Sequence, residues 1–314
     1  MSRLVVLGAD GFIGKNLVTE LAKNSEDEIV AFDRFSSVED MEDTYFSQFE
    51  NVTVYAGNFM NISDIETVLQ ENDFVFHLVS STTPASALSD PFIDVDTNVR
   101  ASVQLFEICV NKNINKLIFL SSGGTVYGDI DSEKISENSV TKPKSPYGIG
   151  KLTIENYLRY FKTTYDLDYI IYRIANPFGP HQNIYARQGV IPIFIQHILE
   201  EEPITVFGDG TMLRDYIYID DVVKMICSSY KVTNKFDEYN IGSGIGRTVN
   251  EIIDSLALLT GSAPKIILKD QPASYVDKSV LDISRFNNEF GIFETTILDK
   301  GLEKTLDYVK RSKK

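Results

Sequence analysis

Short runs of β-branched and aromatic residues alternate with longer amphipathic stretches through the first half of the chain. The runs are LVVLG (4–8), EIVAFD (28–33), VTVYA (52–56), FVFHLV (74–79), KLIFLSS (116–122) and LDYIIYRIAN (167–176). Between them, stretches such as FIGKNLVTELAKN and VRASVQLFEICVNKN repeat apolar residues with a helical period. This alternation predicts an α/β fold with a doubly wound, Rossmann-type parallel sheet.

The pattern becomes less regular after about Gly179. The chain then continues with GVIPIFIQHILEEEPITVFGDG, RDYIYIDDVVKMICSSY, YNIGSG and a helical TVNEIIDSLALLTG. No linker rich in Pro, Gly or Ser separates the two halves, and the sequence contains no internal repeat. We therefore expect a Rossmann domain over residues 1–178 and a smaller α/β lobe over 179–314, packed against the sheet.

Composition and charge exclude several classes of partner. The 314 residues are 43% hydrophobic, which suits a chain with a substantial core. With 45 acidic and 30 basic residues the net charge is -15, which argues against nucleic acid or an anionic membrane as the main partner. No apolar run approaches the roughly 20 residues needed to span a bilayer. We expect a soluble, cytoplasmic protein.

The cysteines and histidines do not suggest a disulfide or a metal site. Cys109 and Cys227 lie in apolar-periodic segments, where buried free thiols are the common outcome, and this fits a reducing cytoplasm. His77, His181 and His197 are far apart and have no companion cysteines, so we expect no metal ligation.

A glycine-rich loop follows the first predicted strand. The loop GADGFIG places Gly8, Gly11 and Gly14 between a strand and a helix, and Asp33 ends the second strand, 19 residues beyond Gly14. In this context the glycines allow a tight turn, the helix N-terminus faces a pyrophosphate, and the carboxylate takes the adenosine ribose hydroxyls. The loop predicts a dinucleotide site. Asp33 favours NAD over NADP, although the following Arg34 can accommodate a 2′-phosphate.

A second motif, SPYGIGK at 145–151, places Tyr147 four residues before Lys151. On a helix these two positions share one face, so the phenol and the ammonium group converge. An unperturbed phenol titrates at about pH 10, and a nearby cation favours the phenolate, which makes Tyr147 a candidate base. The alternative is an ordinary helical pair in which the tyrosine packs and the lysine is solvated.

These motifs, together with GN (57–58), HLVS (77–80) and SSGGTVYG (121–128), resemble the extended short-chain dehydrogenase/reductases. The closer match is to the nucleotide-sugar epimerase and dehydratase family, of which UDP-glucose 4-epimerase is the familiar member. The resemblance covers nearly the whole chain, because the second half supplies RIANPFGP (173–180), GVIPIFIQ (189–196), FGDGTMLRDYIYIDD (207–221) and YNIGSG (239–244).

The resemblance implies an NAD-binding domain over 1–178 and a lobe over 179–314 that mainly binds a nucleotide sugar. It makes Tyr147 the catalytic base and acid, and Lys151 the residue that binds the nicotinamide ribose and lowers the phenol pKa. The implied cofactor contacts are Gly8, Gly11, Phe12, Ile13, Gly14, Asp33, Arg34, Asn58, Phe59, Leu78, Val79, Asn98, Ser121, Tyr147 and Lys151.

The implied substrate is a nucleoside diphosphate hexose, most simply a UDP-hexose. Its implied contacts are Ser122, Thr125, Asn176, Val190 and Arg214. Arg214 suits a dianionic diphosphate, because a chain this acidic needs a fixed guanidinium at such a site. The alternative for Arg214 is an ion pair with Asp215 or Asp220. Asp220 and Asp221 are expected to cap the following helix.

Two positions depart from the family pattern. The family usually has a serine or threonine three residues before the valine of VYG, and this chain has Gly123. Thr125 points to the same side if the segment stays extended, and Ser122 is adjacent, so either hydroxyl could substitute; we take Thr125 as the catalytic hydroxyl. The family also often has an arginine shortly before a late aspartate. Here Ser274 stands three residues before Asp277, and the next arginine is Arg285.

Three functions are compatible with this pattern. The first is an NAD-dependent nucleotide-sugar 4-epimerase, and the second is a 4-ketoreductase acting on a 4-keto-6-deoxy sugar with NADH or NADPH. The third is a non-catalytic dinucleotide sensor, against which an intact Tyr147 and Lys151 count. The segment SGGT has no acidic residue, which disfavours a 4,6-dehydratase. The family also implies a homodimer through helices around 93–112 and 145–164.

Overall fold

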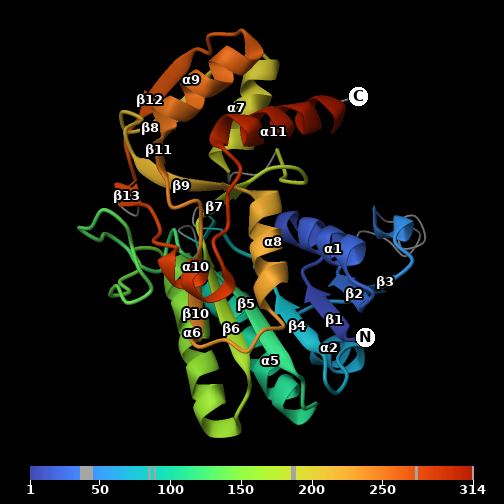
Figure 1. The fold of residues 1–314 in the computed structure, drawn as a ribbon. Coiled ribbons are helices and arrows are strands. Elements are labelled where there is room, and N and C mark those ends of the chain that lie inside the picture. The colour runs from blue at the N-terminus through green and yellow to red at the C-terminus, as the bar shows by residue number, and fades with distance from the viewer. Residues whose placement is uncertain (36–44, 84–85, 88–89, 185–188, 273–274, 313–314) are drawn as a thin grey trace. The chain divides into compact units, whose positions relative to one another are not determined.

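Strands and helices alternate along the first half of the chain, as the hydrophobic pattern predicts (Figure 1). The structure is a computed structural model that describes residues 1–35, 45–83, 86–87, 90–184, 189–272 and 275–312. The described chain divides into two compact units. Unit 1 comprises Met1–Ser121, Ser145–Tyr172 and Ile226–Glu238, and unit 2 comprises Ser122–Lys144, Arg173–Met225 and Tyr239–Lys314.

A doubly wound sheet organises unit 1. Its strands are β1 (Arg3–Leu7), β2 (Glu28–Asp33), β3 (Val52–Ala56), β4 (Phe74–His77), β5 (Lys116–Ser122), β6 (Tyr169–Ile174) and β10 (Glu238–Ile241). They run in the order β10-β6-β5-β4-β1-β2-β3, and the pairings among β1 to β5 are parallel. The chain therefore starts at β1, winds outward to β3 and returns to β4, which confirms the predicted fold class.

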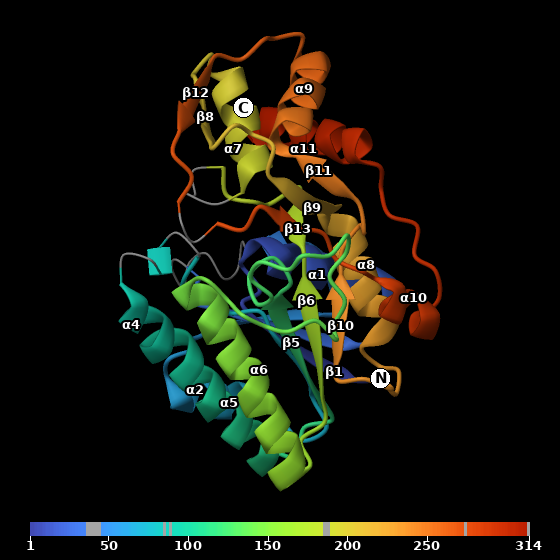
Figure 2. The same ribbon diagram turned by 90° about the vertical axis from the view of Figure 1, so that its left-hand side faces the viewer.

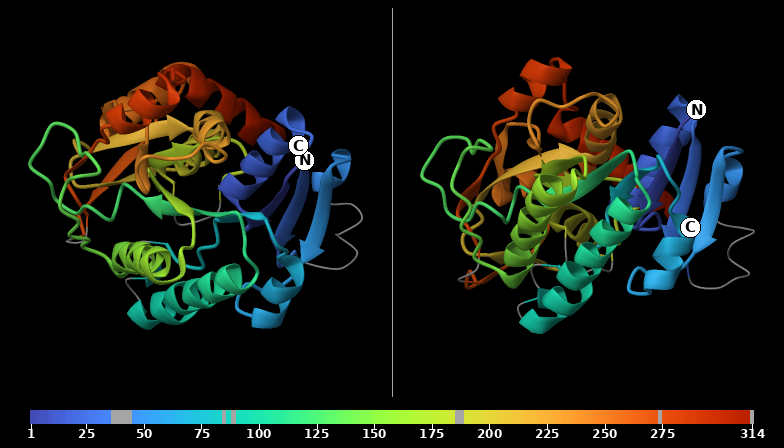
Figure 3. Two further views of the ribbon diagram at one scale, coloured as in Figure 1. Left: turned by 60° about the horizontal axis from the view of Figure 1, so that its bottom comes forward. Right: turned by 90° about the horizontal axis from the view of Figure 1, so that it is seen from below.

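Helices cover both faces of this sheet. They are α1 (Phe12–Asn24), α2 (Ile62–Val68), α4 (Pro91–Ile93), the π-helical η3 (Asp94–Val99), α5 (Arg100–Asn111), α6 (Pro146–Tyr165) and the 3-10 turn η2 (Tyr45–Gln48). Helices α2, α5 and α6 lie on one face and α1 lies on the other (Figures 2 and 3). The predicted dimer helices α5 and α6 pack side by side, and the homodimer itself stays a prediction.

The core of unit 1 lies between the sheet and these helices. Residues of β1, β2, β4 and β5 are buried on both faces of the sheet, so the strands read as continuous apolar runs. Leu105, Phe106, Leu158 and Phe161 of α5 and α6 join this core. Cys109 is a buried free thiol, as expected.

Unit 2 contains two small sheets and a helical layer. Its elements are β7 (Asn176–Phe178), α7 (Val190–Leu199), β8 (Ile204–Phe207), β9 (Leu213–Tyr218), α8 (Ile219–Ser229), β11 (Gly246–Thr248), α9 (Val249–Thr260), β12 (Ile266–Lys269), β13 (Lys278–Ser279), α10 (Ser284–Phe290) and α11 (Leu298–Ser312). Strands β7, β11 and β13 pair with β9, and β12 pairs with β8. Helix α11 packs against α7 and α9. Strands β5, β6 and β10 and helix α8 have residues in both units.

The division of ligand binding at residue 178 stays a prediction, whereas two other expectations have outcomes. Asp220 and Asp221 lie inside the first turn of α8 and so do not cap it. Asp221 instead accepts hydrogen bonds from the backbone N–H (2.7 Å) and hydroxyl (3.0 Å) of Thr296. Among the described residues, no helix has the length and apolar character to cross a membrane.

The close packing of α1 on the glycine loop gives the first prediction. A Cβ atom on Gly14 would overlap Gly8 O and lie 2.8 Å from Ala9 Cα, and these backbone atoms have no room to move aside. We expect Gly14→Ala to lower the free energy of unfolding by about 1–3 kcal/mol, although alanine is the better helix former. Urea unfolding measures it, with Lys23→Ala on the exposed last turn of α1 as control. Equal midpoints for the two variants would contradict the packing.

Candidate functional site

The glycine loop lies where β1 ends at the carboxyl edge of the sheet. Gly8 has φ +92°, a conformation that favours glycine, and its N–H donates to Phe32 O (2.9 Å). A Cβ on Gly8 would lie 3.1 Å from Val79 N, so the loop also touches the segment after β4. Gly11 is the N-cap of α1 and supplies no side-chain cap. Since the first N–H groups of a helix lack partners within it, this end of α1 is open to an anion.

Asp33 ends β2 beside this loop. Its Oδ2 accepts the backbone N–H of Asp10 (3.0 Å) and its Oδ1 accepts that of Arg34 (2.7 Å), so the carboxylate is held at the base of the loop. Arg34 is exposed. An uncapped helix N-terminus next to a fixed carboxylate fits the pyrophosphate and ribose of a dinucleotide, which is the arrangement that the sequence predicts.

The remaining predicted cofactor residues differ in their exposure and packing. Asn58 is exposed and Leu78 and Val79 are half-buried, and the backbone of both lies beside Gly8. The ring of Phe59 is buried against His77, with ring centres 5.0 Å apart, so its side chain belongs to the core. The first-turn residues of α1 in this set, which are half-buried, are Phe12 and Ile13.

Asn98 organises the loop that follows β4. Its Oδ1 accepts the backbone N–H of Ser81 (2.9 Å), and its Nδ2 donates to Thr82 Oγ1 (2.8 Å) and to Asp94 Oδ1 (2.8 Å). The side chain is buried, and its described hydrogen bonds join η3 to residues 81–82 and to Asp94 of the same turn. A cofactor contact by Asn98 stays a prediction, and the structure adds this positioning role, which the sequence alone did not indicate.

Tyr147 and Lys151 share one face of α6. The helix begins at Ser145, whose hydroxyl accepts the N–H of Gly148 (3.2 Å), with Pro146 at its first position. Lys151 Nζ lies 5.8 Å from the centre of the Tyr147 ring and 4.8 Å from that of Phe119. It donates to Leu120 O (2.9 Å) near the end of β5, so the ammonium is buried at the carboxyl edge of the sheet.

The expected direction of the phenol pKa is wrong for the protein without ligand. Burial, with the nearby Asp94 carboxylate, raises the pKa of Tyr147 to about 12, and the Ser80 hydroxyl offsets this only in part. Burial lowers the pKa of Lys151 to about 8, against the opposing effects of Asp94 and Glu155. Lys151 therefore loses its proton more easily than a solvated lysine does. The Asp94 carboxylate disfavours the phenolate form of Tyr147.

Ser121 and two acidic residues complete this part of the site. The Ser121 hydroxyl donates to Glu155 Oε1 (2.6 Å), one turn of α6 beyond Lys151, so it already has a partner inside the fold. Sequence reasoning did not select Glu155 or Asp94 as neighbours of Lys151. The only signals were the spacing of Lys151 and Glu155 on one helix face and that of Asp94 and Asn98 on another.

The segment after β5 belongs to unit 2 and forms a turn. The N–H groups of Thr125 (3.3 Å) and Val126 (3.1 Å) both donate to Ser122 O. The expectation that Thr125 points to the same side as Gly123 assumed an extended segment, and this reason is wrong. Thr125 Oγ1 is nevertheless buried without a hydrogen-bond partner among the described residues, so no described bond inside the fold competes for its hydroxyl.

The glycine at position 123 has a steric cause. A Cβ there would lie 2.5 Å from Leu281 Cδ1 and 3.0 Å from Arg173 O. The hydroxyl residue that the family usually has at this position therefore does not fit beside Leu281. Asn176 lies beside the same turn, because its Oδ1 would be 3.7 Å from a Cβ on Gly124, and its Nδ2 donates to Asp215 O (3.0 Å).

Arg214 makes neither of the expected ion pairs. Among the described residues, its hydrogen bonds go to the carbonyls of Leu213 (3.0 Å), Val276 (2.5 Å) and Asp277 (3.3 Å) and to the sulfur of Met212. The Asp215 carboxylate is occupied elsewhere, since Ser243, Gly244 and Leu281 donate to it. A guanidinium held by carbonyls keeps its charge for an anionic ligand.

The substrate contact of Val190 stays a prediction. Val190 begins α7 and is half-buried, and Ser274 lies outside the described residues. Arg285, the next arginine along the chain, lies 3.5 Å from Glu137 Oε2 and donates to Asn138 Oδ1 (2.6 Å).

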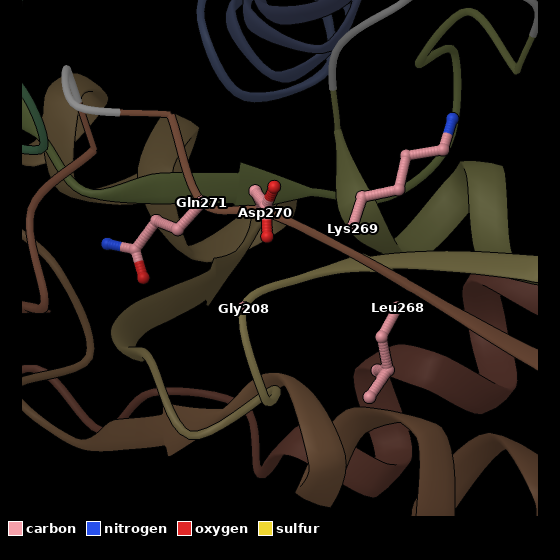
Figure 4. Close-up of a pocket in the computed structure, with 5 residues that line it drawn as sticks. All are labelled: Gly208, Leu268, Lys269, Asp270 and Gln271. Atoms are coloured by element: carbon pink, nitrogen blue, oxygen red, sulfur yellow. The ribbon is translucent and has the colours of Figure 1, made fainter.

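A cavity of about 610 Å³ opens where β8 and β12 end (Figure 4). Its lining residues are Gly208, Leu268, Lys269, Asp270 and Gln271. Gln271 Nε2 donates to Asp277 Oδ1 (3.0 Å), and Asp277 O in turn accepts from Arg214. The cavity and the predicted diphosphate residue thus share a neighbour within unit 2, although no predicted site residue lines the cavity.

The loop, the fold and the Tyr147–Lys151 pair define an NAD-binding enzyme of the extended short-chain dehydrogenase/reductase type. The sequence profile of the NAD dependent epimerase/dehydratase family matches residues 4–242. The chain belongs to this family.

Three relatives show the range of the family. The dTDP-4-dehydro-6-deoxyglucose reductase of Escherichia coli is 31% identical over 98% of this chain and 97% of its own. The structure of UDP-glucose 4-epimerase from Thermotoga maritima with UDP-glucose has a TM-score of 0.90 and 32% identity, and covers 100% of both chains. The Thermus thermophilus UDP-glucose 4-epimerase in complex with NAD has a TM-score of 0.89 and 26% identity, covering 98% of this chain and 99% of that one.

These relatives are one reductase of a nucleotide sugar and two UDP-glucose 4-epimerases, one of them in complex with NAD. The cofactor of this chain is NAD, as the sequence predicts. The glycine loop, the open N-terminus of α1 and Asp33 are the residues whose arrangement fits it.

The buried ammonium of Lys151 gives the second prediction. Below about pH 8 its charge is retained in the fold at a cost, because its pKa falls from 10.5 in the unfolded chain to about 8. We expect Lys151→Met to raise the free energy of unfolding at pH 7 by about 1–3 kcal/mol, after the loss of the bond to Leu120 O. As the pH rises from 8 to 10.5 the wild type loses this cost, so the difference should shrink.

Denaturant unfolding at pH 7 and at pH 9.5 measures this difference. Lys162→Met, on the same helix with its side chain 38% exposed, is the control for removing a lysine that is not buried. A Lys151→Met variant that is less stable than the wild type at pH 7 would show that the ammonium stabilises the fold.

Proposed function

We propose that the protein is an NAD-dependent nucleotide-sugar 4-epimerase. Its substrate is a nucleoside diphosphate hexose of the UDP-glucose and UDP-galactose type, and the reaction passes through a transient 4-keto sugar. The observation that carries this proposal is the Tyr147–Lys151 pair, which lies on one face of α6 with the ammonium buried at the end of β5. The likeness to UDP-glucose 4-epimerase over the whole chain supports it.

Tyr147 is the proton-transfer group in this proposal. Its phenol takes the proton of the sugar 4-hydroxyl and later returns one to the same oxygen. Bound NAD supplies the acceptance and return of the C4 hydride. With a pKa of about 12 the phenol is a poor base in the protein alone, so a positive charge beside it is needed for turnover. Lys151, whose Nζ lies 5.8 Å from the centre of the Tyr147 ring, supplies one such charge, and the oxidised nicotinamide of a bound NAD would supply another.

Residues of unit 2 bind the substrate in this proposal. The unpartnered hydroxyl of Thr125 bonds a sugar hydroxyl, in place of the residue that Leu281 excludes from position 123. Arg214 binds the diphosphate with its guanidinium, which the described carboxylates leave unpaired. Asn176, beside the turn that carries Thr125, is a further polar contact.

A 4-ketoreductase is the second candidate. One relative is a dTDP-4-dehydro-6-deoxyglucose reductase at 31% identity over 98% of this chain. Gly123 also removes the hydroxyl that the epimerase pattern has at that position. In this reaction Tyr147 donates a proton once, and the reduced cofactor is consumed.

The third prediction separates the two candidates. We expect the purified protein to interconvert UDP-glucose and UDP-galactose, or their N-acetylamino counterparts, with no added cofactor, because NAD is regenerated in each turnover. Proton NMR of the anomeric signals follows the reaction. Tyr147→Phe should lose at least about 10³-fold in turnover because its ring has no proton to transfer. Tyr157→Phe, on the exposed side of α6, should keep it.

Unchanged sugar spectra with NAD supplied would exclude epimerisation of these sugars. Oxidation of NADH or NADPH by a 4-keto-6-deoxy sugar would then establish the reductase. Full activity of Tyr147→Phe would overturn both candidates, because each needs the phenol.

The fourth prediction concerns Thr125. Thr125→Val keeps the shape and removes a hydroxyl that has no described partner, so the stability of the ligand-free protein should not fall. The value of kcat/KM should fall about 10-fold or more, as for a lost hydrogen bond to the sugar. Ser122→Ala is the matched comparison, and a larger loss for that variant would assign the role to Ser122.

A further inference from the structure

A π-helical turn lies beside the Tyr147–Lys151 pair. Helices α4, η3 and α5 run as one continuous helix alongside α6 (Figure 2). In η3 a backbone N–H donates to the carbonyl five positions earlier, whereas in an α-helix it donates to the one four positions earlier. The bond from Arg100 N to Val95 O is an example. Such turns are rare and are often found at functional sites. The buried residues of this turn are two polar ones, Asp94 and Asn98.

The Asp94 carboxylate is fixed on its own side. Its Oδ1 accepts hydrogen bonds from the hydroxyl of Thr82 and from Asn98 Nδ2 (2.8 Å). Thr82 and Asn98 also bond each other (2.8 Å), which closes a ring of three side chains. The residue is only 2% exposed, so the carboxylate cannot turn toward solvent without breaking this ring.

The other oxygen is directed at α6. A Cβ on Gly150 would overlap Asp94 Oδ2, so the carboxylate occupies the space that any other residue would fill there. Gly150 is the neighbour of Lys151 and lies one turn after Tyr147. Gly150, the second glycine of the motif YGIGK, therefore has a physical role, because its lack of a side chain leaves room for the Asp94 carboxylate at this turn of α6.

We propose that Asp94 is a positioning residue for the Tyr147–Lys151 pair. Its buried carboxylate is the fixed counter-charge that keeps Lys151 protonated. The inference rests on the proposed function for its catalytic meaning, but not for its physical content. A fixed anion beside two groups favours the ammonium form of one and the neutral form of the other. Asp94 thus holds the lysine charged, and the phenol protonated, in the resting protein.

The other charged groups around the pair do not replace it. Glu155 lies one turn beyond Lys151, and it is shared with Ser121 and with Arg159 (3.3 Å). His77 at the end of β4 is neutral, because burial lowers its pKa to about 3. Arg100 and Asp96 on the continuous helix are exposed. Of the two carboxylates that raise the pKa of Lys151, Asp94 has the larger effect.

The fifth prediction tests this role without a sugar. Lysines labelled with ¹³C at Cε are titrated by NMR, and Lys151→Met assigns the Lys151 signal. We expect the wild type to titrate at about pH 8, and Asp94→Asn, which keeps the shape, to titrate about one unit lower or more. Asp96→Asn makes the same change at an exposed site two residues away and should leave the titration unchanged.

Gly150→Ala is the second variant. It keeps the carboxylate but displaces it, while alanine favours the helix, so it too should lower the titration. It decides the matter if Asp94→Asn does not fold. An unchanged Lys151 titration in the folded variant would overturn the proposal and leave Asp94 a packing role only.

Turnover supplies an independent measurement. Where a sugar is converted, the alkaline limb of kcat should move to lower pH in Asp94→Asn by the same shift as the NMR titration. The wild type could convert none of the tested sugars while the Lys151 titration still moves in Asp94→Asn. That result would refute the proposed function and leave the role of Asp94 intact.

Discussion

Parallel strand pairing is the constraint on which unit 1 depends. Because β1, β2, β4 and β5 all run in one direction, the chain must emerge from each of them at the same edge of the sheet. Gly8, Asp33, Val79 and Leu120 therefore come from distant parts of the sequence to one edge. The helices that follow these strands contribute polar side chains at this edge. On α6, the buried ammonium of Lys151 donates to Leu120 O near the end of β5.

The sequence predicts this framework well, because parallel strands are buried on both faces and appear as apolar runs with no polar alternation. The glycine loop is also legible, since its conformation depends on residues close in the chain. The use of each side chain is less predictable. The resemblance makes Phe59 and Asn98 cofactor residues. In the structure the ring of Phe59 packs on His77, and the side-chain amide of Asn98 bonds residues 81–82 and Asp94. These contacts depend on tertiary packing, which no local pattern records.

The phenol shows the same limit in energetic terms. A tyrosine and a lysine on one helix face suggest a lowered phenol pKa, whereas the pKa of Tyr147 is raised. Burial and a carboxylate from another helix outweigh a lysine that is itself weakened by burial. In unit 2 the departure at Gly123 was visible from the sequence, but its cause, the side chain of Leu281, was not. Residues so far apart in the chain meet only through the fold.

The π-helical turn η3 also separates two parts of one helix in phase. A turn that closes over five residues contains one residue more than an α turn, so the faces before and after it are out of step. The apolar face of α5 stays on the core while the residues of η3 face α6. The residue opposite Gly150 therefore lies outside the hydrophobic repeat of α5, and a substitution there can alter the electrostatics of the Tyr147–Lys151 pair without disturbing that repeat.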